Sequence, residues 1–284
     1  MPGVEQIDDL CSVAERLLDR ELPLARRQEL FSGPRFDVDL WQQMAEMGWF
    51  ALLLPTDEDG FGLKPENLGE LFALLGRFTA PGPFLDHIVI APMLAPIVPS
   101  AARERLLAAS AGTRRVALAD PQIDLEPYRR RALTTTQQGA LTGALPHVRL
   151  GDQIDDLLVV ADDGEGACLL LLEAERTGIR LDRGDSGDPG GWLATVVLED
   201  VATNDSDVVL SGQDASEVLC RLRSAMRLLI AYEISGLAAR LLELTLEHAQ
   251  LRHQFGRPVG AFQAVKHLVA DMQVAAESLD SVLA

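Results

Sequence analysis

Four side chains near the C-terminus are suited to gripping a phosphorylated, planar ligand: Arg252, Gln254, Phe255 and Gln263. An arginine guanidinium offers paired donors to a pyrophosphate, and a glutamine amide offers both a donor and an acceptor. A phenylalanine ring offers a face to an adenine or to a packed interface. Glycines and prolines among these residues predict a turn. An ordinary connector between helices, with Phe255 in the core, is the alternative that the residue types leave open.

Two long helices must position this turn. Upstream, Asp214 and Glu217 have the spacing of a capping box, and no proline follows before His253. Apolar residues then recur every three or four positions, and the stripe that we expect to be buried is Leu219, Leu222, Met226, Ile230, Ile234, Leu237, Leu241 and Leu244. A second helix is expected from about residue 261 onward, with the stripe Phe262, Val265, Val269, Met272, Ala276, Leu279 and Leu283. Such stripes are typical of a helical bundle.

The rest of the chain divides into a helical part and a β-rich part. Residues 1–114 show helical periodicity, interrupted by glycine and proline turns. In residues 115–211 the period changes to two, and strand-like runs cover 116–119, 132–134, 157–160, 169–172 and 195–198. We therefore predict an α+β multidomain fold. Its parts are an α-helical N-terminal domain (1–114), a central β-barrel or sandwich (115–211) and a C-terminal helical bundle (212–284).

Composition narrows the classes of function. The net charge of −18 argues against binding to nucleic acid or to an anionic membrane surface. No apolar run reaches the roughly 18 residues that a membrane span needs, and the acidic N-terminus lacks an apolar signal segment. We therefore expect a cytoplasmic protein. Cys11, Cys168 and Cys220 have neither metal-ligand spacing nor a disulfide framework, so we expect reduced thiols and no metal.

The turn resembles the flavin-binding signature of the acyl-CoA dehydrogenase family, R-x-x-F-G followed by F-Q and a helix that contains A-D-M. This chain carries the signature as Arg252, Phe255, Gly256, Phe262, Gln263, Ala270, Asp271 and Met272. The resemblance implies that these residues bind the FAD of a neighbouring subunit. Arg252 would reach the pyrophosphate, Gln254 and Phe255 would lie along the dinucleotide, and Gln263 would contact it from the following helix.

The resemblance also implies a reaction, the FAD-dependent α,β-dehydrogenation of an acyl-CoA thioester with a carboxylate as base. Arg227 matches a family-typical arginine and would lie at the substrate site, with a plain helix ion pair as the alternative. Met226 stands where a minority of the family carries the catalytic glutamate. Glu233 and Glu243 are expected to be solvated or ion-paired, so the catalytic residue stays unassigned. In most of the family the base lies beyond the second bundle helix, and two helices leave that bundle incomplete.

The family pattern that holds the flavin ring is altered in this chain. Residues 118–124, LADPQID, stand where the family has T-E-P-x-A-G-S-D. Residues 143–150, GALPHVRL, stand where it has G-x-K-x-W/F-I-T-N, so His147 and Arg149 replace an aromatic residue and a threonine. We expect His147 to be a packed polar residue rather than a base. The chain is therefore similar to the degenerate subunit of heteromeric actinobacterial steroid dehydrogenases, and it would complete the FAD site of a second acyl-CoA dehydrogenase chain.

Two other functions stay open on the sequence. One is an ordinary homo-oligomeric dehydrogenase, a tetramer of this chain, with its base outside these residues. The other is a non-enzymatic scaffold or acyl-CoA-binding subunit. Electron-transfer flavoprotein is a further partner that the family resemblance implies. Gly236 and Ala238 are small residues that would leave room for an acyl chain, but the residues give no preference for acyl length or sterol.

Overall fold

A computed structural model describes residues 4–32, 36–120, 134–135, 139–149, 154–162, 166–182 and 193–283. Contacts group the chain into two compact units. Unit 1 comprises residues 1–27, 65–80 and 227–284, and unit 2 comprises residues 28–64 and 81–226. A helical N-terminal region, a β-rich central region and two long C-terminal helices follow one another along the chain, as predicted. The division into domains at 114/115 and 211/212 stays a prediction.

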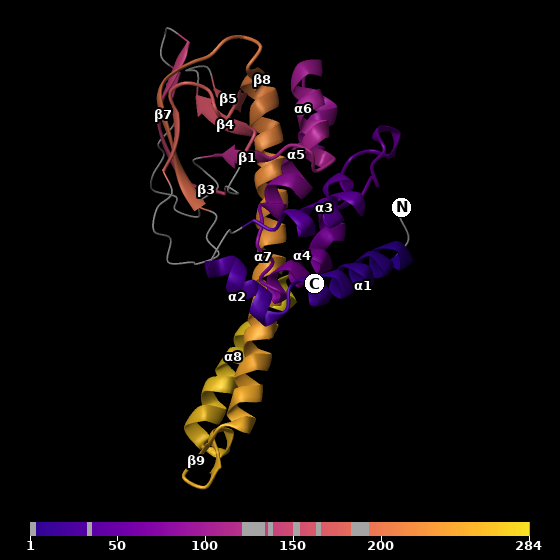
Figure 1. The fold of residues 1–284 in the computed structure, drawn as a ribbon, viewed down its shortest axis with the longest axis vertical. Helices are drawn as coiled ribbons and strands as arrows, with labels where there is room; N and C mark the ends of the chain where they lie inside the picture. The colour runs from indigo at the N-terminus through magenta and orange to yellow at the C-terminus, as the bar shows by residue number, and fades with distance from the viewer. Residues whose placement is uncertain are drawn as a thin grey trace. The chain divides into compact units, whose positions relative to one another are not determined.

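Unit 1 is built from helices. They are α1 (Val4–Glu21), the first residues of α2 (Leu24–Ser32), α4 (Gly69–Arg77) after the short 3-10 helix η3 (Pro65–Leu68), the later part of α7 (Gly212–Leu251), and α8 (Gln263–Leu283). Figure 1 shows α8 returning alongside the end of α7, with the connecting turn labelled β9 at the tip of this helical hairpin. Tyr232 ties the two helices together, because its hydroxyl donates to the Leu283 carbonyl at 2.8 Å.

Glycines bring α4 and α7 into close contact within unit 1. A Cβ added to Gly236 would lie 1.8 Å from the Ala73 carbonyl oxygen, and one added to Gly76 would lie 1.9 Å from the Glu233 carbonyl oxygen. Each glycine therefore lets the backbone of the other helix approach. The Ala73 backbone occupies the space that a side chain at Gly236 would need, while Gly236 also lines a cavity of about 520 Å³ with residues of α1 and α4, so the expectation that it leaves room for an acyl chain stays a prediction.

In unit 2, short helices surround a buried aromatic cluster. They are α3 (Val38–Glu46), the 3-10 helices η1 (Trp49–Ala51) and η2 (Thr56–Glu58), the π-helical turn η4 (Asp86–Ile90), α5 (Ala91–Leu94), η5 (Ala95–Ile97) and α6 (Ser100–Ser110). Trp41 packs against Phe50 with ring centroids 4.2 Å apart, and its edge meets His87 at 4.5 Å. Gly48 ends the α3 segment with a φ of 77° and redirects the chain into η1.

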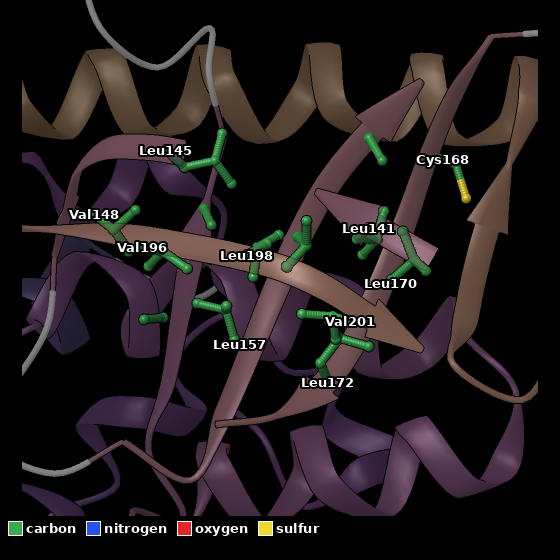
Figure 2. Packing of buried hydrophobic residues seen from close by; sticks show 14 of the residues in the cluster. Leu141, Leu145, Val148, Leu157, Cys168, Leu170, Leu172, Val196, Leu198 and Val201 are labelled. Atoms are coloured by element: carbon green, nitrogen blue, oxygen red, sulfur yellow. The ribbon is translucent and has the colours of Figure 1, made fainter. Parts of the chain in front are cut away.

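The sheet of unit 2 has eight strands among the described residues. They are β1 (Val116–Ala119), β2 (Thr134–Thr135), β3 (Ala140–Arg149), β4 (Asp156–Asp162), β5 (Ala167–Glu173), β6 (Ile179–Asp182), β7 (Leu193–Ala202) and β8 (Val208–Ser211). The order is β6-β7-β3-β2-β4-β5-β8, with β1 parallel to β4. Alternate apolar residues of β3, β4, β5 and β7 converge into one core (Figure 2). β3, β6 and β8 were not predicted, and part of the expected 132–134 strand lies outside the described residues.

Burial tests the two predicted helix stripes. On α8 every predicted position is half-buried, so that stripe has the correct register. On α7 the prediction holds for Leu219, Leu222 and Met226, which are at most 1% exposed. It is wrong for the apolar patch Ile234, Leu237, Leu241 and Leu244, whose members are 45–55% exposed. Periodicity identifies an apolar face, but it does not say whether the same chain covers that face. None of the described helices is long and apolar enough to cross a membrane.

Candidate functional site

The turn between α7 and α8 is a small, tightly defined hairpin. β9 (His253–Gln254) pairs with β10 (Arg257–Pro258), and Gln254 lies opposite Arg257. The two residues between them, Phe255 and Gly256, have φ angles of 54° and 77°. Two consecutive positive φ angles are the signature of a type I′ turn, whose twist matches that of the paired strands. A backbone hydrogen bond of 2.7 Å from the Val259 N–H to the Arg252 carbonyl closes the base of the hairpin.

The predicted ligand-binding side chains of this hairpin are exposed to solvent. Arg252, Gln254 and Gln263 are exposed, and Phe255 is 93% exposed. The alternative with Phe255 in the core is therefore wrong. Phe255 instead meets the edge of the Phe262 ring at 6.1 Å. Within the described part of the chain, neither the Arg252 guanidinium nor the Gln254 amide has a hydrogen-bond partner.

Neighbouring residues support the hairpin from one side. The Arg257 guanidinium stacks over the Phe262 ring at 4.1 Å, and such a contact contributes about 0.5–1 kcal/mol at an exposed site. Gln263 lies at the start of α8, with its amide nitrogen 3.3 Å from His267 Nε2. The four predicted residues thus lie on the hairpin and at its junctions with α7 and α8, within residues 252–263. Their donor set, a free guanidinium with two amides and a ring face, suits the pyrophosphate and adenine of a dinucleotide.

Arg227 does not belong to this group of side chains. It is exposed on α7, about 24 residues before the helix ends, which corresponds to roughly 36 Å of helix. Met226 beside it is fully buried. The carboxylate of Glu243 is engaged by Arg77 at 2.7 Å and by Arg240 at 2.9 Å, which confirms the prediction that it is ion-paired. Neither Met226, which has no proton acceptor, nor the ion-paired Glu243 is therefore assigned as the base.

In residues 118–124, the segment that stands where the family holds the flavin ring, Asp120 forms an ion pair with Arg223 of the same chain. Asp120, at the end of β1, accepts two hydrogen bonds from the Arg223 guanidinium, at 2.7 and 2.9 Å. The Asp120 side chain is fully buried by this contact. Breaking a buried pair of this kind costs about 3–5 kcal/mol, so Asp120 is held in a structural role. Residues 121–124 of the same motif lie outside the described residues.

The second altered motif lies on β3. The β3–β7 register shifts between Leu145 and Val148, and His147 lies in this irregularity with a φ of 61°. Its side chain is exposed. The expectation of a packed polar residue is therefore wrong, because the bulge turns the side chain toward solvent instead of into the sheet.

A buried polar pair on η4 escaped prediction. Asp86 and His87 are 2% and 0% exposed. Burial raises the pKa of the Asp86 carboxyl to about 7, while the Arg149 guanidinium and the Leu118 N–H lower it. Burial lowers the pKa of His87 to about 4; its Nδ1 lies 3.2 Å from the Pro83 carbonyl and its Nε2 accepts from the Val116 N–H. The only signal in the sequence was two polar residues inside the apolar run FLDHIVIAP.

One oxygen of this pair stands out. Asp86 Oδ2 has no hydrogen-bond partner among the described residues, although it is buried. A lone buried carboxylate oxygen is costly unless the group is protonated, which agrees with the raised pKa. The π-helical turn that carries Asp86 is a feature that often occurs at functional sites.

Comparisons with known proteins match both ends of the chain to one family. The model described as "Acyl-CoA dehydrogenase, N-terminal domain" matches residues 5–112, and "Acyl-CoA dehydrogenase, C-terminal domain" matches residues 222–284, which include the hairpin. The acyl-CoA dehydrogenase FadE27 of Mycobacterium tuberculosis is 30% identical over 280 residues, which cover 94% of this chain and 71% of that protein.

Solved structures agree with these matches. A chain in the crystal structure of the ChsE4–ChsE5 complex from Mycobacterium tuberculosis has a TM-score of 0.85 and 26% identity, covering 99% of this chain and 76% of that chain. The FAD complex of PigA has a TM-score of 0.81 at 19% identity, covering 100% of this chain and 78% of that chain, and shows the shared fold. The predicted helical, β and helical order is therefore the acyl-CoA dehydrogenase fold.

Proposed function

Because this chain belongs to the acyl-CoA dehydrogenase family, whose members bind FAD, we propose that it is one subunit of a heteromeric acyl-CoA dehydrogenase. In this proposal its hairpin completes the FAD site of a partner chain that carries the base. The substrate is an acyl-CoA thioester, with a steroid side-chain thioester as the favoured class. The resemblance to a chain of the ChsE4–ChsE5 complex supports the heteromeric arrangement.

The exposed hairpin is the observation that carries the proposal. Phe255 is 93% exposed on the two-residue turn, and the guanidinium of Arg252 at the base of the hairpin has no hydrogen-bond or ion-pair partner among the described residues. Exposed aromatic and arginine side chains on a rigid element are the usual anchors of an interface with another molecule. Arg252 would donate to the pyrophosphate and Phe255 would cover the adenine, while Gln254 and Gln263 fix their orientation.

The flavin, when bound, supplies the redox chemistry by accepting a hydride from the substrate. This chain's contribution is to bind and orient the dinucleotide. Met226 has no proton-accepting group, and Glu243 is occupied by two arginines. The base is therefore assigned to the partner, and Arg227 is proposed to contact the thioester's CoA portion. We place the complex in the cytoplasm, with electron-transfer flavoprotein as the acceptor.

The test is purification of the chain alone and with a candidate partner from the same source. Flavin absorbance near the visible maximum gives the FAD content, and reduction of an acceptor dye by acyl-CoA gives the activity. We expect the chain alone to carry little FAD and to be inactive, and the complex to carry FAD and reduce the dye. Stoichiometric FAD with turnover by the chain alone would assign it to the homo-oligomeric dehydrogenases. Inactivity with every partner that forms a stable complex would assign it to the scaffold subunits.

A further inference from the structure

Unit 1 contains a cavity of about 650 Å³, lined by α1, the segment that begins α2, α4 and α7. This volume is in the usual range for a small-molecule site. The charged side chains that line it are Glu15, Arg16, Asp19, Arg27, Arg77 and Arg240. Four guanidiniums from four elements therefore face one space, in a chain whose net charge is −18.

Two of these arginines are already partly neutralised. Arg77 binds both oxygens of Glu243, at 2.7 and 2.9 Å, and Arg240 donates to the same carboxylate at 2.9 Å. One carboxylate thus serves two guanidiniums. Since each guanidinium has five N–H donors, Arg77 and Arg240 keep donors that Glu243 does not use.

The other two arginines have no counterion in the described part of the chain. Neither Arg16 nor Arg27 forms an ion pair with any residue that the structure describes. Glu15 and Asp19 line the same cavity, yet neither comes within ion-pair distance of them. Glu247 also lies 3.8 Å from Arg240, so with Glu243 and Glu247 counted four carboxylates stand near the four guanidiniums, and both of these added carboxylates pair with Arg77 or Arg240.

Arg27 is held in place in a way that a surface arginine is not. Its Nη1 donates to the Phe78 carbonyl at 3.2 Å and to Thr79 Oγ1 at 3.3 Å. Its Nε is buried and has no hydrogen-bond partner. Burial and the charge of Arg240 both lower the pKa of Arg27. The protein therefore fixes a partly desolvated cation beside a second cation, an arrangement that an anion between them would stabilise.

We propose that this cavity binds a small organic phosphate, at a site separate from the hairpin. A phosphate carries up to two charges on three oxygens, so it can accept from guanidiniums of several elements at once. A monocarboxylate has one charge and two oxygens and would satisfy fewer of them. Leu22, Pro23 and Phe78 supply an apolar wall for the uncharged part of the ligand.

The test uses the full chain and two probes, pyrophosphate and ADP, with isothermal titration calorimetry at low ionic strength. Arg16→Gln and Arg27→Gln each remove one guanidinium from the cavity. Arg16 is exposed and makes no hydrogen bond to the described residues, so its replacement leaves packing intact even if Arg27→Gln disturbs the fold. Arg221→Gln is the matched control, an exposed arginine on α7 outside the cavity lining. Circular dichroism confirms folding of each variant.

We expect both probes to bind the wild-type chain, and binding to weaken about tenfold in Arg16→Gln and in Arg27→Gln, the loss of one charge-assisted hydrogen bond. Arg221→Gln should bind as the wild type does. Three outcomes would overturn the proposal: no binding at millimolar probe, equal binding by the wild type and Arg16→Gln, or loss of binding in Arg252→Ala instead. The last would place the probe on the hairpin. The first two outcomes do not bear on whether the hairpin completes a partner's FAD site, whereas the third would support that role of the hairpin while overturning the cavity proposal.

Discussion

The Arg252 side chain is available to a ligand as far as the described residues go. It is exposed, and the described residues give its guanidinium no hydrogen bond or ion pair. Arg252→Ala should therefore leave the thermal stability of the chain unchanged within about 0.5 kcal/mol. In the assembled complex it should weaken FAD binding about tenfold or more, because a bidentate contact to a pyrophosphate is lost. Flavin retained after gel filtration measures this effect.

A matched variant separates the Arg252 effect from a general loss of charge. Arg221→Ala removes an equally exposed arginine from α7 and should retain FAD at the wild-type level. If Arg252→Ala complexes keep their full flavin content, the hairpin has a structural role only.

Asp86 gives the fold a defined response to pH. Its pKa is about 7 in the folded chain against an ordinary 3.8, so the folded state holds a proton that the unfolded state has already lost between these values. Stability from this group is present below pH 4 and is lost as the pH rises to 7, with a ceiling of about 4 kcal/mol. Asp86→Asn should therefore stabilise the protein at pH 7.5, by an amount that declines toward pH 4. Urea unfolding at several pH values measures it.

The titration of His87 changes the stability of the fold in the opposite direction over most of the same pH range. Its pKa falls from 6.5 to about 4 on folding, so stability from this residue is lost as the pH falls from 6.5 to 4. In the wild type, the pH dependence of the unfolding free energy that Asp86 causes therefore opposes the one that His87 causes. In Asp86→Asn only the histidine slope remains, so that variant should gain stability between pH 4 and 6.5. A variant with the same stability as the wild type at every pH would show that Asp86 is already ionised in the fold.

At the scale of the element, the crossing of α4 and α7 depends on glycine. In an ordinary helix, Gly→Ala stabilises by about 0.5–1 kcal/mol. Gly236→Ala should instead destabilise by about 2 kcal/mol or more, because the new Cβ would lie 1.8 Å from the Ala73 carbonyl and one helix must move. The sign alone decides the matter, and thermal unfolding measures it. A stabilised variant would mean that the helices do not cross there.

How far an element can be predicted depends on what covers it. The α8 stripe has the right register because its apolar side packs on one neighbour, and α7 is right where unit 2 encloses Leu219, Leu222 and Met226. β6 and β8 are four residues each, too short for alternation to exceed chance.

The features of the candidate site also differ in how far the sequence predicts them. The hairpin follows from local residues, since Gly256 and the paired strands fix a two-residue turn. The arginine cavity does not, because it combines side chains from four separate segments. The burial of the adjacent Asp86 and His87 also depends on distant residues, which include Val116 and Arg149. The exposure of His147 depends on a shift in the β3–β7 register, which the residue types in this stretch do not predict.

At the scale of the whole molecule, the apolar patch on α7 predicts association. Leu237 and Leu241 are 45% and 55% exposed on a helix that continues to the hairpin, and such a patch marks an interface. Leu241→Gln should leave circular dichroism unchanged while lowering the mass of the complex, or its yield with a partner. Light scattering coupled to gel filtration measures this. Gln250→Ala, an exposed polar position on α7, is the control and should assemble normally.

The left-handed backbone at Phe255 has a consequence for the stability of the isolated chain. A bulky residue with a φ of 54° costs on the order of 1 kcal/mol, whereas asparagine or glycine adopts that angle freely. The Phe255 ring therefore slightly lowers the stability of the isolated chain. Contacts of the ring in an assembled complex would offset that cost.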